Sequence, residues 1–227
     1  MSESPSTELH VVDVCGTLVR DDTTVGLLRF HLSRMANRWI RKLLFKALTL
    51  RYSPIRIAFA LFEKVTGRQQ FKRLLVRTLA GDRVNDLEES ARLYARELLD
   101  TRRVMRVWTK LETVDPRDRI LLASASLEPV VRALADAIGA RFVASRLEQR
   151  HGVLTGHFAE DLTGKKREAI ARKFGENFLA HRYVAYSDNI SDKELLLAAS
   201  SACVVLRRAG HRQRWQGVAA EFVGQDE

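Results

Sequence analysis

The sequence predicts an α/β protein with a parallel sheet and an α-helical segment inserted after its first strand. Short apolar runs that end on polar residues alternate with helical patterns at the start of the chain and again after about residue 116. Residues 21–115 show helical spacings and no convincing strand pattern. We therefore predict a core domain of residues 1–20 and 116–227 and an α-helical cap domain of residues 21–115, which a chain of 227 residues can supply.

The first predicted strand is the apolar run that ends at Asp13. Residues 9–12 are rich in apolar and β-branched side chains, and a turn at Gly16 and Thr17 follows at once. Ligands of open α/β sheets bind outside the carboxyl ends of the strands. Asp13 is therefore placed where the chemistry of such a fold is expected.

The inserted segment opens with a helix-capping sequence at Asp21 and Asp22. Apolar residues then recur at helical spacing, and Pro54 and Gly67 divide the pattern into pieces. Residues 86–99 form a clear amphipathic pattern. The segment therefore predicts several helices rather than one long one.

The positive charge of the chain is concentrated in this segment. The net charge is +10, and residues 29–77 contain 13 Lys and Arg residues against one acid, Glu63. Residues 43–62 are apolar, but Lys46 and Arg51 interrupt them, and each central charge costs roughly 2.5–3.5 kcal/mol in a membrane span. Two interpretations stay open. We favour a cap whose basic side is solvated over interfacial helices whose basic side faces anionic headgroups.

The framework resumes with strands and helices in alternation. The predicted strands are residues 119–124, 140–145, a short return strand at 152–156, 182–186 and 202–206. The predicted helices are residues 129–138 with Gly139 as the stop, 164–174, 192–199 with Ser191 as the cap, and a closing helix in the Arg-rich remainder around Trp215. Such alternation implies a Rossmann-like parallel sheet with right-handed crossovers.

Polar residues follow the ends of three predicted strands and the start of one helix. If the strands are neighbours, these groups converge at one edge of the sheet. They are Asp13, Ser124, Asp188, Asp192 and a lysine, either Lys165 or Lys166. Carboxylate oxygens suit a magnesium ion, whereas a lysine, a hydroxyl and turn amides suit phosphoryl oxygens. The pattern predicts a site for a divalent cation and a phosphate.

The first of these segments resembles the first motif of the haloacid dehalogenase superfamily, an apolar run followed by Asp-x-Asp-Gly-Thr-Leu. Asp13, Gly16, Thr17 and Leu18 match it, and Cys15 replaces the second aspartate. The other motifs follow in the correct order. Ser124 is similar to the second motif, Lys166 fits the third better than Lys165, and Asp188 with Asp192 resembles the fourth.

The long insertion also resembles the helical cap of the phosphoserine-phosphatase-like branch of this superfamily. Its basic and apolar character, together with the Tyr-Ser-Asp sequence at residues 186–188, is similar to phosphatidylglycerophosphate phosphatases of the C type. The resemblance implies a haloacid dehalogenase core with an inserted cap.

The resemblance implies a magnesium-dependent phosphomonoester hydrolase that works through an aspartyl-phosphate. Asp13 would be the nucleophile, with Cys15 at the acid–base position and Lys166 neutralising the site. Gly16, Thr17 and Ser124 would bind the phosphoryl group. The implied magnesium ligands are Asp13, the backbone carbonyl of Cys15 and Asp188, with Asp192 in support.

Cys15 bears on the rate of the implied reaction. The aspartate usual at this position protonates the leaving oxygen and then deprotonates the attacking water, which typically contributes 10²–10⁴-fold. A thiol with a reference pKa near 8.5 can donate a proton but is a poor base beside a phosphate. We therefore expect a slow enzyme. The alternative is a catalytically impaired relative that binds a phosphorylated ligand or partner.

The expected partner is a phosphorylated small molecule or lipid headgroup, with an anionic membrane surface as a further candidate for the basic cap. A nucleic-acid partner is disfavoured because no recognised motif accompanies the basic faces. Cys15 and Cys203 do not suggest a disulfide framework, and residues 1–8 lack the apolar core of a signal peptide. These features predict a cytoplasmic protein, either free or peripheral to the inner face of the membrane.

Overall fold

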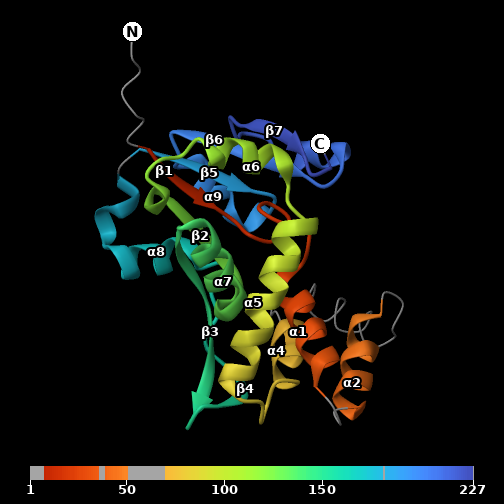
Figure 1. Cartoon of the computed structure of the whole chain (residues 1–227). Helices are drawn as coiled ribbons and strands as arrows, with labels where there is room; N and C mark the ends of the chain where they lie inside the picture. Colours follow the sequence, from red (N-terminus) through yellow and green to blue (C-terminus); the bar gives the residue numbers. More distant parts are fainter. Residues whose placement is uncertain (1–7, 36–38, 51–69, 181, 227) are drawn as a thin grey trace.

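The computed structural model describes residues 8–35, 39–50, 70–180 and 182–226 (Figure 1). Within these residues a seven-stranded sheet runs in the order β4-β3-β2-β1-β5-β6-β7. The strands are β1 (Leu9–Val12), β2 (Ile120–Leu127), β3 (Arg141–Arg150), β4 (Val153–Glu160), β5 (Tyr183–Ser187), β6 (Ser201–Leu206) and β7 (Glu221–Gly224). Neighbours are parallel except for the antiparallel hairpin of β3 and β4. The predicted α/β fold with a mainly parallel sheet is confirmed.

The named elements between β1 and β2 in the described residues are helices, except for the short turn η1 (Arg117–Arg119) just before β2. These helices are α1 (Thr23–Arg34), α2 (Trp39–Thr49), α4 (Gln70–Arg77), α5 (Val84–Thr101) and α6 (Met105–Glu112). The framework adds α7 (Glu128–Ile138), α8 (Lys166–Phe174), α9 (Lys193–Leu197) and the 3₁₀ turns η1 (Arg117–Arg119), η2 (Glu176–Ala180), η3 (Ile190–Asp192) and η4 (Ala209–Trp215). The capping sequence begins α1 as predicted, because the Asp22 carboxylate accepts hydrogen bonds from the amides of Thr24 and Val25.

The apolar stretch of residues 43–62 lies partly outside the described residues. α2 ends at Thr49. The predicted breaks at Pro54 and Gly67 fall in residues 51–69 and cannot be compared with the structure. Among the helices that the structure does describe, none combines the length and the apolar character needed to cross a membrane.

Alternating strand residues build a core on each face of the sheet. Val12 and Leu122 face a cluster that includes buried side chains of α1, α5, α6 and α7. Val11 and Leu121 face the opposite cluster, which contains side chains of α8 and α9. The helices of the insertion thus share an apolar core with one face of the sheet. The division of the chain into two domains stays a prediction.

The β3–β4 hairpin joins the framework to the insertion. It extends past α7 and lies beside α4 and α5 (Figure 1). The amide of Gly81 donates to the Leu154 carbonyl over 2.8 Å, and the amide of Leu154 donates to the Asp82 carbonyl over 2.9 Å. The sequence pattern indicated only a short return strand at residues 152–156. The structure extends it because these bonds and the contact with α4 give the hairpin a partner.

The predicted closing helix around Trp215 is wrong. The segment forms only the 3₁₀ turn η4, and β7 follows it as an edge strand paired with β6. Trp215 and Val218 are buried on the α8 side of the sheet, and Gly217 turns the chain with φ +81°. Burial of these side chains and strand pairing at the sheet edge therefore give a turn and a strand where the sequence suggested a helix.

Ser191 is not the helix cap that the sequence predicts. The Asn189 side chain accepts a hydrogen bond from the Ser191 amide over 3.1 Å and begins the 3₁₀ turn η3. α9 then extends only from Lys193 to Leu197. Asn and Ser both cap helices well, so spacing alone does not distinguish them.

At Gly26 in α1 we predict that an alanine destabilises the protein, which is the opposite of the usual effect of this substitution in a helix. An alanine in a helix interior is normally more stable than a glycine by about 1 kcal/mol. A Cβ atom on Gly26, however, would lie 1.8 Å from the Tyr94 hydroxyl, which donates to Asp21 over 2.9 Å. We expect Gly26→Ala to lower the free energy of unfolding by about 1–3 kcal/mol in urea denaturation. A stabilised variant would show that α1 and α5 are not packed this closely.

Candidate active site

The topology brings the predicted strand ends together. β1 pairs with β2 on one side and with β5 on the other. The chain therefore changes direction across the sheet at β1, and crevices at such switch points bind the ligands of open α/β folds. The amide of Asp13 donates to the Tyr186 carbonyl over 2.9 Å, which fixes the start of the loop after β1.

Lys166 is the centre of a buried ion cluster. Its ammonium lies 2.8 Å from Asp13 Oδ1 and 2.6 Å from Asp192 Oδ2. Ser187 donates to the same Asp192 oxygen over 2.7 Å. α8 begins at Lys166 and points this side chain at the strand ends. The structure thus brings Lys166 to Asp13, whereas Lys165 is exposed.

Burial and charge set the protonation of this cluster. Burial raises the pKa of Asp13 to about 6, against the attraction of Lys166 and with added repulsion from Asp192 and Asp188. Burial alone would lower the pKa of Lys166, but its attraction to Asp13 and Asp192 outweighs this and raises it. The lysine therefore stays charged and can bind an anion beside Asp13.

Asp188 lies on the other side of the loop after β1. Thr17 donates to its Oδ1 over 3.3 Å, and Arg207 Nε lies 2.6 Å from its Oδ2. A Cβ atom on Gly16 would lie 2.3 Å from Oδ2, and Gly16 has φ +76°. Only glycine lets the backbone approach the carboxylate this closely. The predicted turn at Gly16 and Thr17 therefore packs directly on Asp188.

Ser124 lies inside β2 rather than at its end. The sequence ended this strand at Ser124, but β2 continues to Leu127, with an irregular register against β3 between Ala123 and Leu127. The Ser124 hydroxyl is buried and accepts from the amide of Ser126 over 3.2 Å. The irregular register interrupts the pairing of β2 with β3 at this position.

Cys15 occupies a polar niche between β2 and the start of α1. Its sulfur lies 2.9 Å from the Ser126 hydroxyl and 3.0 Å from the Thr23 hydroxyl, and the Thr23 amide donates to it over 3.4 Å. Burial, followed by the charges of Asp22 and Asp13, raises the pKa of Cys15 to about 11. The thiol is neutral at pH 7.

The raised pKa predicts that Cys15 alkylates slowly. Only the thiolate reacts, so at pH 8 the rate with iodoacetamide should be about a hundredfold or more below that of a free cysteine, and it should rise until about pH 11. Peptide mass spectrometry after timed quenching measures the labelling rate of Cys15. The Cys203 peptide is an internal check that the chain stays folded during labelling, since Cys203 is buried. Fast labelling of Cys15 at pH 7 would contradict the neutral thiol.

Several residues at this site escaped the sequence analysis. Thr23 and Ser126 contact Cys15, Ser187 donates to Asp192, and Arg207 pairs with Asp188. Lys72 also belongs to this group: its ammonium donates to the Ala125 carbonyl over 2.7 Å and to Asp161 over 2.6 Å. Arg207 had a detectable signal, because it directly follows β6 at the same sheet edge. No sequence signal pointed to Lys72, because α4 lies near the site only as a result of tertiary packing.

Comparison with known proteins now identifies the family. The sequence matches the model of the haloacid dehalogenase-like hydrolases over residues 11–197. The chain belongs to this family. No curated protein sequence matches it.

Solved structures of this haloacid dehalogenase fold resemble the chain over nearly its whole length. A protein of unknown function from Bordetella pertussis Tohama I has a TM-score of 0.67 at 18% identity, covering 97% of this chain and 100% of its own. Cytosolic 5′-nucleotidase IIIB bound to cytidine has a TM-score of 0.63 at 16% identity, covering 98% and 82%. A phosphoserine phosphatase from T. onnurineus has a TM-score of 0.54 at 17% identity, covering 98% and 92%. At these identities the likeness shows the fold.

The site of this haloacid dehalogenase-like hydrolase offers oxygen donors that fit magnesium. Asp13 and Asp188 flank the same loop, and the close approach at Gly16 places backbone beside the Asp188 carboxylate. No cluster of three His, Cys or acidic side chains suited to a metal occurs among the described residues. Magnesium does not need one, because it commonly uses one or two carboxylates and keeps several waters. Asp192 Oδ2 already accepts hydrogen bonds from Lys166 and Ser187.

Proposed function

We propose that this protein is a magnesium-dependent phosphomonoester hydrolase in which Asp13 forms an aspartyl-phosphate. The observation that carries the proposal is the placement of Asp13 at the switch point of the sheet, 2.8 Å from a buried lysine that can bind an anion. Family membership supports the same reaction class.

The chemistry proceeds in two steps. A carboxylate oxygen of Asp13 attacks phosphorus, the bond to the leaving oxygen breaks, and that oxygen takes up a proton. Water then attacks phosphorus, the bond to Asp13 breaks, and inorganic phosphate leaves. Lys166 binds the phosphoryl oxygens throughout and offsets the negative charge that gathers beside Asp13 and Asp192.

The surrounding residues position the phosphate and the metal. Ser124 supplies a hydroxyl from β2, whereas the turn at Gly16 and Thr17 shapes the loop after Asp13, because its two amides already donate to the carbonyls of Val19 and Val14. Asp13, the Cys15 carbonyl and Asp188 would hold magnesium, which when bound supplies positive charge to the transferring phosphoryl group. Arg207 Nε lies 2.6 Å from Asp188 Oδ2.

Cys15 makes the proposed enzyme slow. With a pKa of about 11, its thiol, next to Ser126 and Thr23, is a weak proton donor to the leaving group, and because it is protonated at pH 7 it cannot accept a proton from the attacking water. A second candidate function follows from this residue: a protein that binds a phosphorylated ligand without turning it over.

Phosphate release measured with wild-type protein over a panel of phosphomonoesters tests the proposal. We expect magnesium-dependent release that EDTA abolishes, and a phosphorylated Asp13 peptide after acid quenching of the reaction. Tight binding of phosphate esters with no release and no phosphopeptide would instead favour the binding protein.

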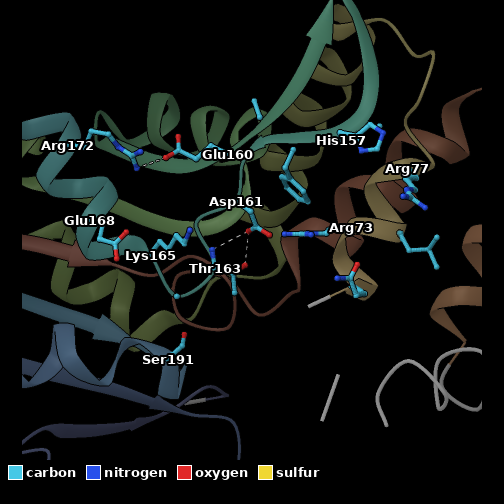
Figure 2. A pocket seen from close by; sticks show the side chains of 16 residues that line it. Arg73, Arg77, His157, Glu160, Asp161, Thr163, Lys165, Glu168, Arg172 and Ser191 are labelled. Atoms are coloured by element: carbon cyan, nitrogen blue, oxygen red, sulfur yellow. Dashed lines mark hydrogen bonds and ion pairs between the residues drawn. The ribbon is translucent and has the colours of Figure 1, made fainter. Parts of the chain in front are cut away.

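A hollow beside the site suggests where the rest of the substrate lies. It has a volume of about 1380 Å³ and is bounded by α4, β4 and the start of α8, with Arg73 and Arg77 on one wall and Lys165 on another (Figure 2). Of the three acids in its lining, Glu160 and Asp161 pair with Arg172 and with Lys72, and Glu168 is exposed near the start of α8. Arg73, Arg77 and Lys165 make no ion pair with any described residue. We propose that the substrate carries a second anionic group.

Removal of two cations from this hollow should weaken acidic substrates selectively. We expect Arg73→Gln/Arg77→Gln to raise KM at least about tenfold for phosphomonoesters that carry a carboxylate or second phosphate, because a charge-assisted hydrogen bond is lost. Phenyl phosphate should be unaffected. Arg92→Gln/Arg96→Gln is a matched control, since these exposed residues have the same spacing on α5. Equal effects of both pairs would refute a substrate role for the hollow.

A further inference from the structure

The helix α2 presents an apolar face to solvent. Trp39 is 68% exposed, Ile40 62% and Leu43 61%, and Leu44 and Leu50 are also among the exposed large apolar residues. Residues 39, 40, 43 and 44 recur at helical spacing, so their side chains form one continuous strip. Contiguous exposed apolar surface of this kind marks an interaction site more often than a solvated surface.

The opposite side of α2 holds the helix in a defined orientation. Phe45 and Leu48 are buried in the core that α2 shares with α1. Arg41 Nη1 lies 2.9 Å from Asp82 Oδ1 in the turn before α5. α2 lies at the edge of the molecule, on the far side of α1 from α5 (Figure 1). The apolar strip therefore faces outward on an anchored helix.

The charge around the strip selects its partner. α2 carries three basic residues, Arg41, Lys42 and Lys46, and no acid. Lys46 is exposed, one turn from Leu43. A second copy of this chain would bring the same excess of positive charge to the contact, which opposes association. An anionic lipid surface attracts these cations while its acyl region accepts the apolar side chains, as in helices that lie in the membrane interface.

We propose that α2 docks this protein onto anionic phospholipid surfaces, with Trp39, Ile40 and Leu43 entering the headgroup region. The docking is peripheral and uses a helix of 11 residues that lies along the surface. It does not require catalysis, so binding is measurable whether or not the protein hydrolyses phosphate esters.

Flotation with vesicles of phosphatidylcholine containing one third phosphatidylglycerol tests this docking. We expect wild-type protein to float at low salt, to float much less as salt rises, and to stay unbound on pure phosphatidylcholine. Trp39→Gln/Leu43→Gln should lower the partition coefficient at least about tenfold, since two apolar side chains no longer enter the interface. Lys42→Gln/Lys46→Gln should weaken binding mainly at low salt.

Met105→Gln/Leu197→Gln is the matched control, because it removes two similarly exposed apolar residues, 51% and 54%, from α6 and α9. It should float like the wild type. Thermal unfolding of each variant confirms that the fold is kept. Failure of the wild type to float, or equal losses in both double variants, would overturn the proposal. So would a wild-type dimer that Trp39→Gln/Leu43→Gln converts to a monomer without any effect on flotation.

Discussion

Asp13→Asn should abolish phosphate release. The proposed nucleophile is the carboxylate oxygen 2.8 Å from Lys166 Nζ, and an amide cannot form the aspartyl-phosphate. Loss of a nucleophile typically costs several orders of magnitude, so we expect kcat to fall on the order of 10⁴-fold or more. Phosphate release under saturating substrate and magnesium measures the change, and acid quenching should show no phosphopeptide.

The stability of this variant separates catalysis from folding. Burial raises the pKa of Asp13 from 3.8 to about 6. As pH rises from about 4 to about 6, the unfolded chain ionises first, so this group lowers the free energy of unfolding over that window. The asparagine variant lacks this effect and should be at least as stable as wild type at pH 7 in EDTA. A variant that is inactive because it has unfolded would not test the role of Asp13.

Cys15→Asp should raise the turnover number by about 10²–10⁴-fold for substrates with poor leaving groups. The niche at residue 15 already suits a carboxylate, because the Thr23 and Ser126 hydroxyls and the Thr23 amide all lie within hydrogen-bonding distance of the Cys15 sulfur. Burial and the nearby Asp13 and Asp22 would raise the pKa of the new aspartate, as they raise that of the thiol. A raised pKa suits a general acid.

The choice of substrate and control makes the test specific. p-Nitrophenyl phosphate has a leaving group that needs no proton, so its first step should change little, whereas alkyl phosphates should gain most. Cys15→Ser matches the thiol in size and cannot act as a base, so it should stay as slow as the wild type. If Cys15→Asp gives no gain on alkyl phosphates, the wild-type rate is limited elsewhere, and the acid–base explanation of Cys15 is wrong.

The sequence predicted most of the framework because local patterns and fold rules agree there. Buried apolar runs predicted β1, β5 and β6, and Gly139 ends α7 in the left-handed conformation that glycine favours. The sequence pattern gave the wrong secondary structure where long-range packing determines it. The Arg-rich remainder after β6 suggested a helix, but Trp215 is buried on the sheet and the chain continues into the edge strand β7.

The residues of the candidate site also fall into two groups, those that the sequence indicated and those that only the fold brings to the site. Asp13, Lys166, Asp188 and Asp192 were all named from the sequence, because strand ends and helix starts of an open sheet converge at a known edge. The roles of these residues stay predictions for the variants above to test. The partners of Cys15 were not predictable, since Thr23 and Ser126 belong to a helix and a strand about a hundred residues apart that meet only in the folded chain.

The sequence by itself determined the fold class and showed that Cys15 departs from the family motif, since these depend on residue identity and on the alternation of strands and helices. Only the tertiary structure decided which lysine meets Asp13, what surrounds the Cys15 thiol, and that α2 turns an apolar strip to solvent. The reason is physical. Periodicity shows that a helix has an apolar face, but whether that face is buried depends on which other elements reach it.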